Sequence, residues 1–164
     1  VDYGPIKSQV FNTDLFTPTQ TAYVLALHFD LLPEELRPLA AAELVADIER
    51  RDMHLSTGFV GAPYLPHVLS SNGQLDTAYA LLFQKSWPSW LYSVTQGATT
   101  IWELWNATTA APDMNSQNHV MMLGDLVVWF FENLAGIKTN PENPGFKEII
   151  MNPVFALCLI WDLM

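Results

Sequence analysis

The sequence has little of what builds a disulfide or metal framework. It contains one cysteine, Cys158, which cannot form an internal disulfide bond. Its four histidines (His28, His54, His67 and His119) are not spaced like the ligands of a zinc site. We therefore expect no metal, no cofactor and no disulfide framework.

Positive charge is also scarce. Only 7 residues are Lys or Arg against 17 Asp or Glu, and the formal net charge of -10 disfavours nucleic acid or an anionic membrane as a partner. The longest apolar runs, residues 126–131 and 154–161, are too short to span a bilayer. The N-terminus has no basic segment followed by an apolar one. We expect neither nucleic acid nor membrane as a partner, and the sequence carries no signal for a cellular location.

Motifs for two common kinds of chemistry are missing as well. The sequence has no glycine-rich phosphate loop, nucleophile elbow or Cys/His arrangement, so phosphoryl transfer and acyl-enzyme chemistry have no support. What is abundant is apolar surface, because half of the 164 residues are hydrophobic and only 15% are charged. This hydrophobic fraction is high and this charged fraction is low for a free-standing domain, which indicates faces that another surface covers.

Apolar periodicity predicts helices in series after an irregular segment over residues 1–19. The clearest helix begins near Pro38, and its inner face repeats at helical spacing as Ala41, Leu44, Val45 and Ile48. The other helices are expected over residues 20–31, 62–69, 75–83, 88–94 and, as the longest, 115–134, which Gly136 ends. Short connections between such helices form antiparallel hairpins. The predicted class is therefore all-α, with a single β-strand near residues 146–151.

Aromatic side chains concentrate in one part of the sequence. Trp87, Trp90, Tyr92, Trp102 and Trp105 fall within nineteen positions. Flat rings at this density could stack on the apolar faces of a sugar. The alternative interpretation is a core or interface that is rich in aromatic residues.

Glu103 lies between two of these tryptophans, and two interpretations of it stay open. A carboxylate in a partly desolvated pocket lined by rings could act as a general base. Alternatively, Thr100 and Glu103 fit a capping box, in which Glu103 only returns a hydrogen bond to the Thr100 amide. His119 is expected on the apolar stripe of the long helix, either as a satisfied buried residue or as a hydrogen-bonding partner of a sugar hydroxyl.

Four motifs together carry a resemblance to a known family. They are residues 54–61 (HLSTGFVG), 87–92 (WPSWLY), 97–103 (GATTIWE) and 114–119 (MNSQNH). In this order they resemble the bacterial α-L-rhamnosidases, and the resemblance runs from about Gln20 to Pro153. The combination is far more specific than any one of the four motifs.

The resemblance implies a catalytic domain of six helical hairpins, an (α/α)6 toroid, followed by a small β-sandwich. Residues 20–137 would then be the later hairpins of the toroid, and residues 138–164 the truncated start of the C-terminal β-sandwich. The resemblance also implies a function, the hydrolysis of terminal α-L-rhamnosyl groups of glycosides or polysaccharides with inversion. The expected partner is an L-rhamnose-containing glycoside.

The same resemblance assigns roles to two residues. Glu103 matches the general base, which activates the water that attacks the anomeric carbon, and His119 matches a histidine that contacts the bound rhamnose. Trp102 and Trp90 are expected to bind substrate beside them. Inversion needs a second carboxyl group as general acid, about 6.5–9.5 Å from the base. In the family this acid lies further upstream, and residues 1–19 contain no counterpart, so we expect a fragment without it.

Two departures from the family pattern bear on this interpretation. Leu104, Trp105 and Asn106 stand where many relatives have Arg-Trp-Asp, and the sequence after Phe155 no longer resembles the family. The alternative function is a non-catalytic helical scaffold, or a module that binds carbohydrate or protein. Apolar faces left uncovered by missing hairpins predict self-association or pairing with a complementary upstream half.

Overall fold

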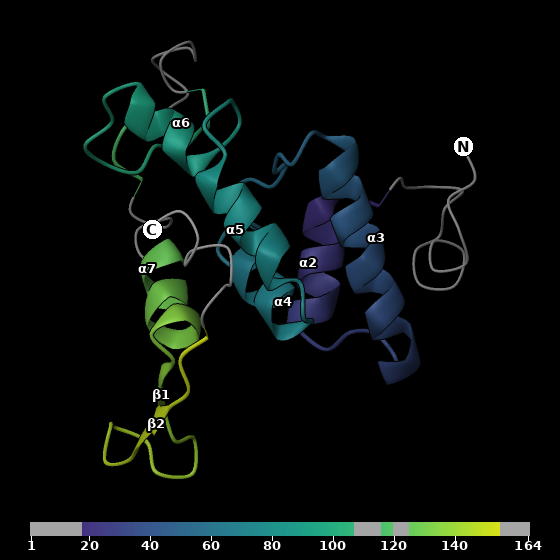
Figure 1. Cartoon of the computed structure of the whole chain (residues 1–164), viewed down its shortest axis with the longest axis vertical. Coiled ribbons are helices and arrows are strands. Elements are labelled where there is room, and N and C mark those ends of the chain that lie inside the picture. The colour runs from purple at the N-terminus through teal and green to yellow at the C-terminus, as the bar shows by residue number, and fades with distance from the viewer. Residues whose placement is uncertain (1–17, 107–115, 120–124, 155–164) are drawn as a thin grey trace, which may run out of the picture. The chain divides into compact units, whose positions relative to one another are not determined.

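The structure is a computed structural model that describes residues 18–106, 116–119 and 125–154 (Figure 1). The chain divides into two compact units, Val1–Leu123 and Gly124–Met164. The first unit contains the helical hairpins and every predicted site residue. The second contains a short helical segment and a two-stranded sheet.

The first unit begins with α2 (Gln20–His28). The hydroxyl of Thr19 accepts a hydrogen bond from the Ala22 amide at 3.2 Å, which caps the otherwise unpaired start of the helix. Tyr23, Val24 and Leu27 are buried on its inner face. The helix ends earlier than the predicted residue 31.

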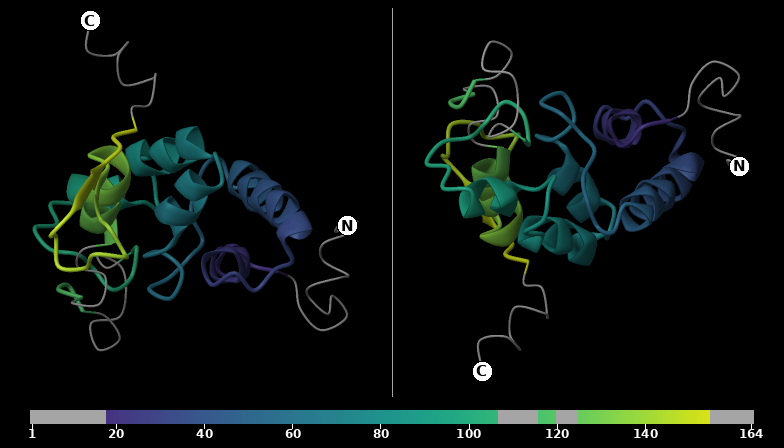
Figure 2. Two further views of the ribbon diagram at one scale, coloured as in Figure 1. Left: turned by 90° about the horizontal axis from the view of Figure 1, so that it is seen from below. Right: turned by 90° about the horizontal axis from the view of Figure 1, so that it is seen from above.

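A 3-10 turn, η1 (Glu34–Leu36), leads into α3 (Arg37–Arg50). Pro38 lies in the first turn of α3, where the missing amide hydrogen would have had no helical partner in any case. The buried face of α3 consists of Ala40, Ala41, Leu44 and Ile48. The helices α2 and α3 pack side by side as an antiparallel hairpin (Figures 1 and 2). The predicted amphipathic helix near Pro38 is therefore confirmed.

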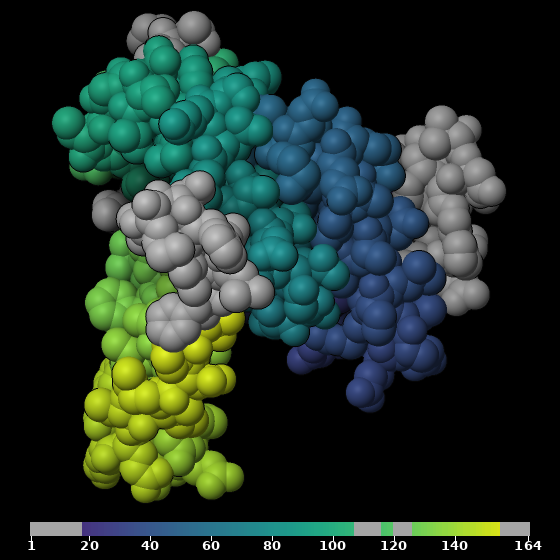
Figure 3. All heavy atoms as spheres, viewed as in Figure 1, coloured from purple at the N-terminus to yellow at the C-terminus, as the bar shows by residue number. Residues whose placement is uncertain are grey.

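A second hairpin follows, formed by α4 (Leu65–Ser71) and α5 (Leu75–Phe83). The turn between them passes through Gly73 at φ 73°, a left-handed conformation that glycine adopts without strain. The short helix α6 (Trp90–Thr95) starts at Ser89, whose hydroxyl accepts from the Tyr92 amide at 3.0 Å. Helix α4 packs against α2 as well as against α5, and in the space-filling view the blue and teal parts of the first unit adjoin on one face (Figure 3).

Charged groups surround a buried phenol where α2 meets α3. Burial, reinforced by the negative charges of Glu43 and Asp47, raises the pKa of Tyr23 to about 12. Burial alone would raise the pKa of Asp47 too, but hydrogen bonds and ion pairs with Arg51 and Arg50 lower it below the ordinary value. Tyr23 therefore stays neutral in the core, while Asp47 stays charged at its edge.

The predicted long helix over residues 115–134 is wrong. Residues 116–119 are not helical, and the structure describes α7 over Asp125–Trp129. This helix (Asp125–Trp129) continues as a π-helix, η4 (Phe130–Leu134). Residues 116–119 instead use their backbone groups to bond to a distant segment, which an apolar stripe in the sequence cannot reveal. The remaining residues of the range, 115 and 120–124, lie outside the described part of the chain.

In the second unit, β1 (Ile137–Thr139) pairs antiparallel with β2 (Ile149–Met151). The strand predicted near residues 146–151 thus exists in shorter form, but its partner β1 was not predicted, because three residues are too few for a periodic signal. Gly136 ends the helical segment, as expected, with φ 65°. A Cβ atom at this glycine would lie 2.0 Å from the carbonyl carbon of Asn152, so no larger residue fits.

Helical hairpins with one small sheet confirm the predicted all-α class. None of the helices in the described ranges combines the length and the apolar character needed to cross a membrane.

Candidate functional site

Two segments that carry predicted site residues run side by side in the first unit. The amide of Glu103 donates to the carbonyl of Ser116 at 2.8 Å, and the amide of His119 donates to the carbonyl of Ile101 at 2.8 Å. The hydroxyl of Thr100 donates to the carbonyl of Gln117. Three hydrogen bonds thus join residues 100–103 to residues 116–119, and they place Glu103 and His119 on neighbouring segments.

The carboxylate of Glu103 is held by the same pairing. Its Oε2 accepts a hydrogen bond from the Ser116 amide at 2.8 Å, and the side chain is half-buried. Among the described residues no hydrogen bond engages Oε1. The capping-box alternative is wrong, since no helix starts at Thr100 and residues 101–106 are irregular. Within the described part of the chain, one oxygen of Glu103 is thus held by a backbone amide and the other is left for other chemistry.

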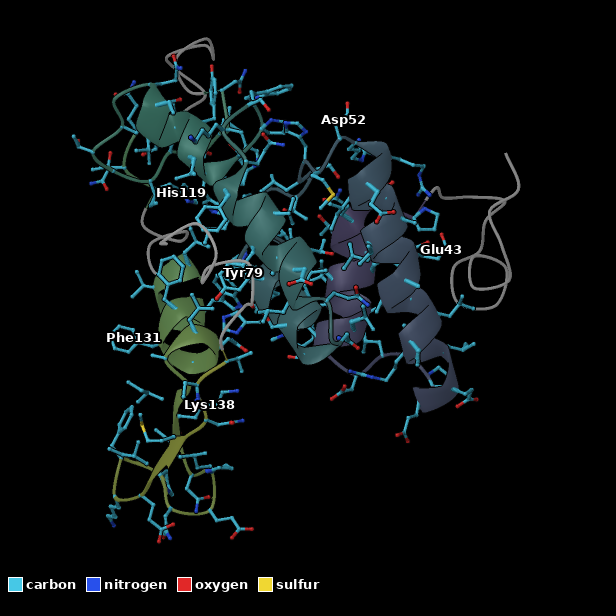
Figure 4. The ribbon with its side chains drawn as sticks, viewed as in Figure 1. Glu43, Asp52, Tyr79, His119, Phe131 and Lys138 are labelled. Carbon is cyan, nitrogen blue, oxygen red and sulfur yellow. The ribbon has the colours of Figure 1, made fainter. Side chains whose placement is uncertain are left out.

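His119 is half-buried on the paired segment and not on a helix, so its predicted helical position is wrong (Figure 4). Its Nδ1 is buried and has no hydrogen-bond partner among the described residues. The centroid of its ring lies 5.9 Å from the centroid of the Phe59 ring, with 48° between the two ring planes. Phe59 is 46% exposed. Within the described ranges, this imidazole nitrogen therefore keeps unused hydrogen-bonding capacity that suits a hydroxyl group.

The tryptophans of the predicted cluster separate into two groups. Trp90 and Trp102 are each only 8% exposed, whereas Trp87 is 54% exposed. The rings of Trp90 and Trp105 are arranged edge to face, with their centroids 5.6 Å apart and 87° between the planes. The indole Nε1 of Trp105 donates to the carbonyl of Thr57 at 2.7 Å. Trp90 and Trp102 therefore pack mainly against protein, and each leaves only a small part of its ring accessible.

The loop that carries Thr57 and Phe59 is fastened to α2. Gln20 is fully buried, and its side chain donates to the carbonyl of His54 at 3.2 Å and accepts from the Ser56 amide at 2.6 Å. These two bonds satisfy both ends of a buried amide, which would otherwise carry a desolvation cost. The two hydrogen bonds therefore fix the position of the loop relative to α2.

The two ends of this loop are also constrained. At its start, Asp52 and Met53 adopt left-handed backbone conformations with φ 52° and 58°, which reverse the chain after α3. At its end, a Cβ atom on Gly61 would lie 2.9 Å from Oγ1 of Thr21, so glycine lets the loop approach α2 closely.

Sequence reasoning missed four residues that build this arrangement. Thr57 and Phe59 lie inside the motif of residues 54–61, which was used for the resemblance without assigning them roles. Gln20 is a polar residue at the start of a helix, where exposure is the usual expectation. Ser116 lies inside the motif of residues 114–119, but its residue type gave no sign of this role, because it acts through its backbone amide.

The arrangement supplies the means for proton transfer and for binding hydroxyl groups. It combines a carboxylate oriented by a backbone amide, an imidazole nitrogen with no partner among the described residues, and the ring of Phe59 next to that imidazole. Within the described ranges, no three His, Cys, Asp or Glu side chains gather closely enough to hold a metal ion.

Residues 10–134 match a protein family described as the bacterial alpha-L-rhamnosidase 6 hairpin glycosidase domain. Curated relatives named alpha-L-rhamnosidase include one from Alteromonas sp. (strain LOR), which is 42% identical over 156 residues. Another, from Formosa agariphila, is 46% identical over 143 residues. These alignments cover 90% and 84% of this chain but 17% and 15% of the relatives. The chain therefore spans less than a fifth of the length of either.

Solved structures agree with this match. The crystal structure of Streptomyces avermitilis alpha-L-rhamnosidase complexed with L-rhamnose aligns with a TM-score of 0.76 at 44% identity, over 82% of this chain and 13% of that chain. The alpha-L-rhamnosidase from Aspergillus terreus aligns with a TM-score of 0.75 at 38% identity, over 83% of this chain and 16% of that chain. At these identities the similarity covers both fold and sequence.

Proposed function

Because the chain belongs to the family of bacterial α-L-rhamnosidases with a six-hairpin glycosidase domain, we propose that it is part of an enzyme that hydrolyses terminal α-L-rhamnosyl groups. The substrates are glycosides or polysaccharides that contain L-rhamnose, and the reaction proceeds with inversion at the anomeric carbon. This chain contributes the general base and part of the sugar site, and it lacks the general acid.

The observation that carries the proposal is the hydrogen bond from the Ser116 amide to Oε2 of Glu103. A general base must present one oxygen to the attacking water in a fixed direction. The amide holds one carboxylate oxygen, so the other can receive the proton of the water. Glu103 is therefore the general base.

Inversion requires that water attack from the face opposite to the leaving group while a second carboxyl group protonates the glycosidic oxygen. We propose that a segment upstream of residue 1 supplies this acid. The short span of this chain relative to its curated relatives, 17% and 15% of their lengths, is consistent with a site completed by other segments.

In the proposed site, His119 binds a rhamnose hydroxyl, and Trp102 and Trp90 form the aromatic side of the sugar pocket. The buried Nδ1 of His119, without a partner among the described residues, supports its role. The low exposure of both tryptophans favours contact with the sugar through ring edges, with the rest of each ring supporting the base segment.

The proposed layout assigns residues 20–137 to the later hairpins of the toroid and residues 138–164 to the start of a β-sandwich. The sheet of β1 and β2 supports this, because Ile149, Ile150 and Met151 are all exposed on a two-stranded sheet, which needs further strands for stability. In the first unit, Phe29 and Phe83 are exposed, which favours self-association or a complementary upstream half.

The test measures nitrophenol release from 4-nitrophenyl α-L-rhamnoside by this chain and by its Glu103→Gln variant. A nitrophenol leaving group partly relieves the need for a general acid. Glu49→Gln is the matched control, because Glu49 is an exposed carboxylate on α3. Equal circular dichroism spectra establish that all three proteins are folded. We expect turnover in the parent and in Glu49→Gln, and a loss of about 10²–10⁴-fold in Glu103→Gln.

The anomer that forms first tests the stereochemistry. Proton NMR of the fresh reaction should show β-L-rhamnose before mutarotation, and initial α-L-rhamnose would refute inversion. Full turnover in Glu103→Gln would remove Glu103 from the mechanism. A parent chain without turnover would make it an inactive half-domain, and the non-catalytic scaffold would then be preferred.

A further inference from the structure

We propose that Trp105 is a positioning residue for the general base, an inference that rests on the proposed function of Glu103. Trp105 lies two positions after Glu103, on the same irregular segment. Its side chain is half-buried and links this segment to two other parts of the first unit.

The first link is a hydrogen bond. The indole Nε1 of Trp105 donates to the carbonyl of Thr57 at 2.7 Å, and the two residues are 48 positions apart in the sequence. Thr57 is only 1% exposed, so its carbonyl belongs to a buried stretch of the loop that Gln20 fastens to α2. A bond in such surroundings is shielded from competition with water, and its loss leaves an unpaired carbonyl.

The second link is the ring contact with Trp90 on α6, at 5.6 Å and 87°. An edge-to-face arrangement of this kind fixes the orientation of both rings. Together, the two links fix the position and orientation of the Trp105 side chain. They therefore limit how far the backbone at Glu103 can move relative to residues 116–119.

These contacts close a circuit of three segments around the proposed site. Trp105 joins the base segment to Thr57, and Phe59 on the same loop meets the ring of His119. His119 returns to the base segment through its amide, which donates to the carbonyl of Ile101. The circuit sets the relative position of Glu103 and His119, and within it the indole of Trp105 is the hydrogen-bonded connection between the base segment and the loop.

The experiment follows the Ser116 amide proton by NMR as the pH is varied, in the full chain and without any substrate. In the parent, this proton should shift with the ionisation of Glu103, because the carboxylate is its acceptor. The shift should vanish in Glu103→Gln. In Trp105→Phe the titration amplitude should fall by more than half, because a hydrogen bond weakens steeply once its partners move apart.

Trp87→Phe is the matched control, because it makes the same change in ring size at a tryptophan that is 54% exposed. It should retain the full amplitude. Replacing Trp105 with 3-benzothienylalanine, which keeps the ring shape but replaces the N–H with sulfur, separates the hydrogen bond from packing and serves if Trp105→Phe does not fold. This replacement should also reduce the amplitude.

Full amplitude in both Trp105 variants would overturn the positioning role. The readout needs no turnover, so an inactive parent chain with a reduced amplitude in these variants would reject the proposed function while retaining the link from Trp105 to Glu103. Loss of turnover in Glu103→Gln together with unchanged amplitude in the Trp105 variants would support the proposed function and reject the link from Trp105 to Glu103.

Discussion

The helical hairpins and the site segments are held together in different ways. In α2 to α5, apolar side chains at helical spacing are buried against each other, as Val24, Leu44 and Leu65 show with no exposed surface. In the site, residues 54–61, 100–106 and 116–119 are joined by a few hydrogen bonds and ring contacts between positions that are not neighbours in the sequence.

The difference separates stability from geometry. Apolar burial provides most of the free energy of folding, and it is roughly proportional to area, without strict direction. Hydrogen bonds add less net free energy but fix distances and angles. Substitutions in the hairpins should therefore destabilise the first unit, while substitutions in the site should displace Glu103 and His119 within a folded unit.

The largest effect is expected for Leu44→Ala in α3. Leu44 is fully buried, so its truncation should leave a cavity and lower the free energy of unfolding by about 2–5 kcal/mol. Leu104→Ala makes the same change at a residue that is 39% exposed beside the base, and it should cost much less. Urea unfolding followed by circular dichroism measures both. Equal losses in the two variants would contradict the division between the two regions.

A smaller effect, shared by both regions, is expected for Gln20→Leu. This change removes the buried amide that bonds to His54 and Ser56, and should cost about 1–3 kcal/mol because two backbone groups lose their partner. It should also shift the NMR signals of Phe59 and His119. Gln96→Leu, at an exposed position after α6, is the control. Unchanged Phe59 and His119 signals in Gln20→Leu would show that the loop keeps its position without Gln20.

The smallest global effect is expected for Thr100→Val, which removes the hydroxyl that donates to Gln117. Thr100 is exposed, so the free energy of unfolding should change by less than about 1 kcal/mol. The exchange of the His119 amide hydrogen should nevertheless speed up, because local opening of the paired segments becomes easier. Thr99→Val changes the exposed neighbour and should leave this exchange rate as it is. A large drop in global stability would refute a purely local role.

Local patterns predicted the hairpins well. The helix of residues 75–83 was expected with the bounds that α5 has, and the apolar spacing from Ala41 to Ile48 identified the buried face of α3. Both succeed because neighbouring residues of a helix decide its apolar face by themselves. Gly136 was likewise predicted as a stop from its own conformational freedom.

The same reasoning failed where the partner is distant. Residues 116–119 belong to an apolar pattern that favours helix, yet they pair with residues 100–103. Thr100 and Glu103 fit a capping box, but there is no helix for them to cap. The motifs that contain Glu103 and His119 indicated which residues to consider, and gave no information on how the two segments meet.

The sequence by itself determined the all-α class, most of the hairpins of the first unit and, through four motifs, the family of this chain. These properties depend on local periodicity or on residue identity at given positions. Only the tertiary structure decided that Ser116 holds the carboxylate of Glu103, that Trp105 bonds to Thr57, and that Phe59 meets His119. Such contacts join segments through backbone groups or ring edges, and these leave no trace in the order of residue types along the chain.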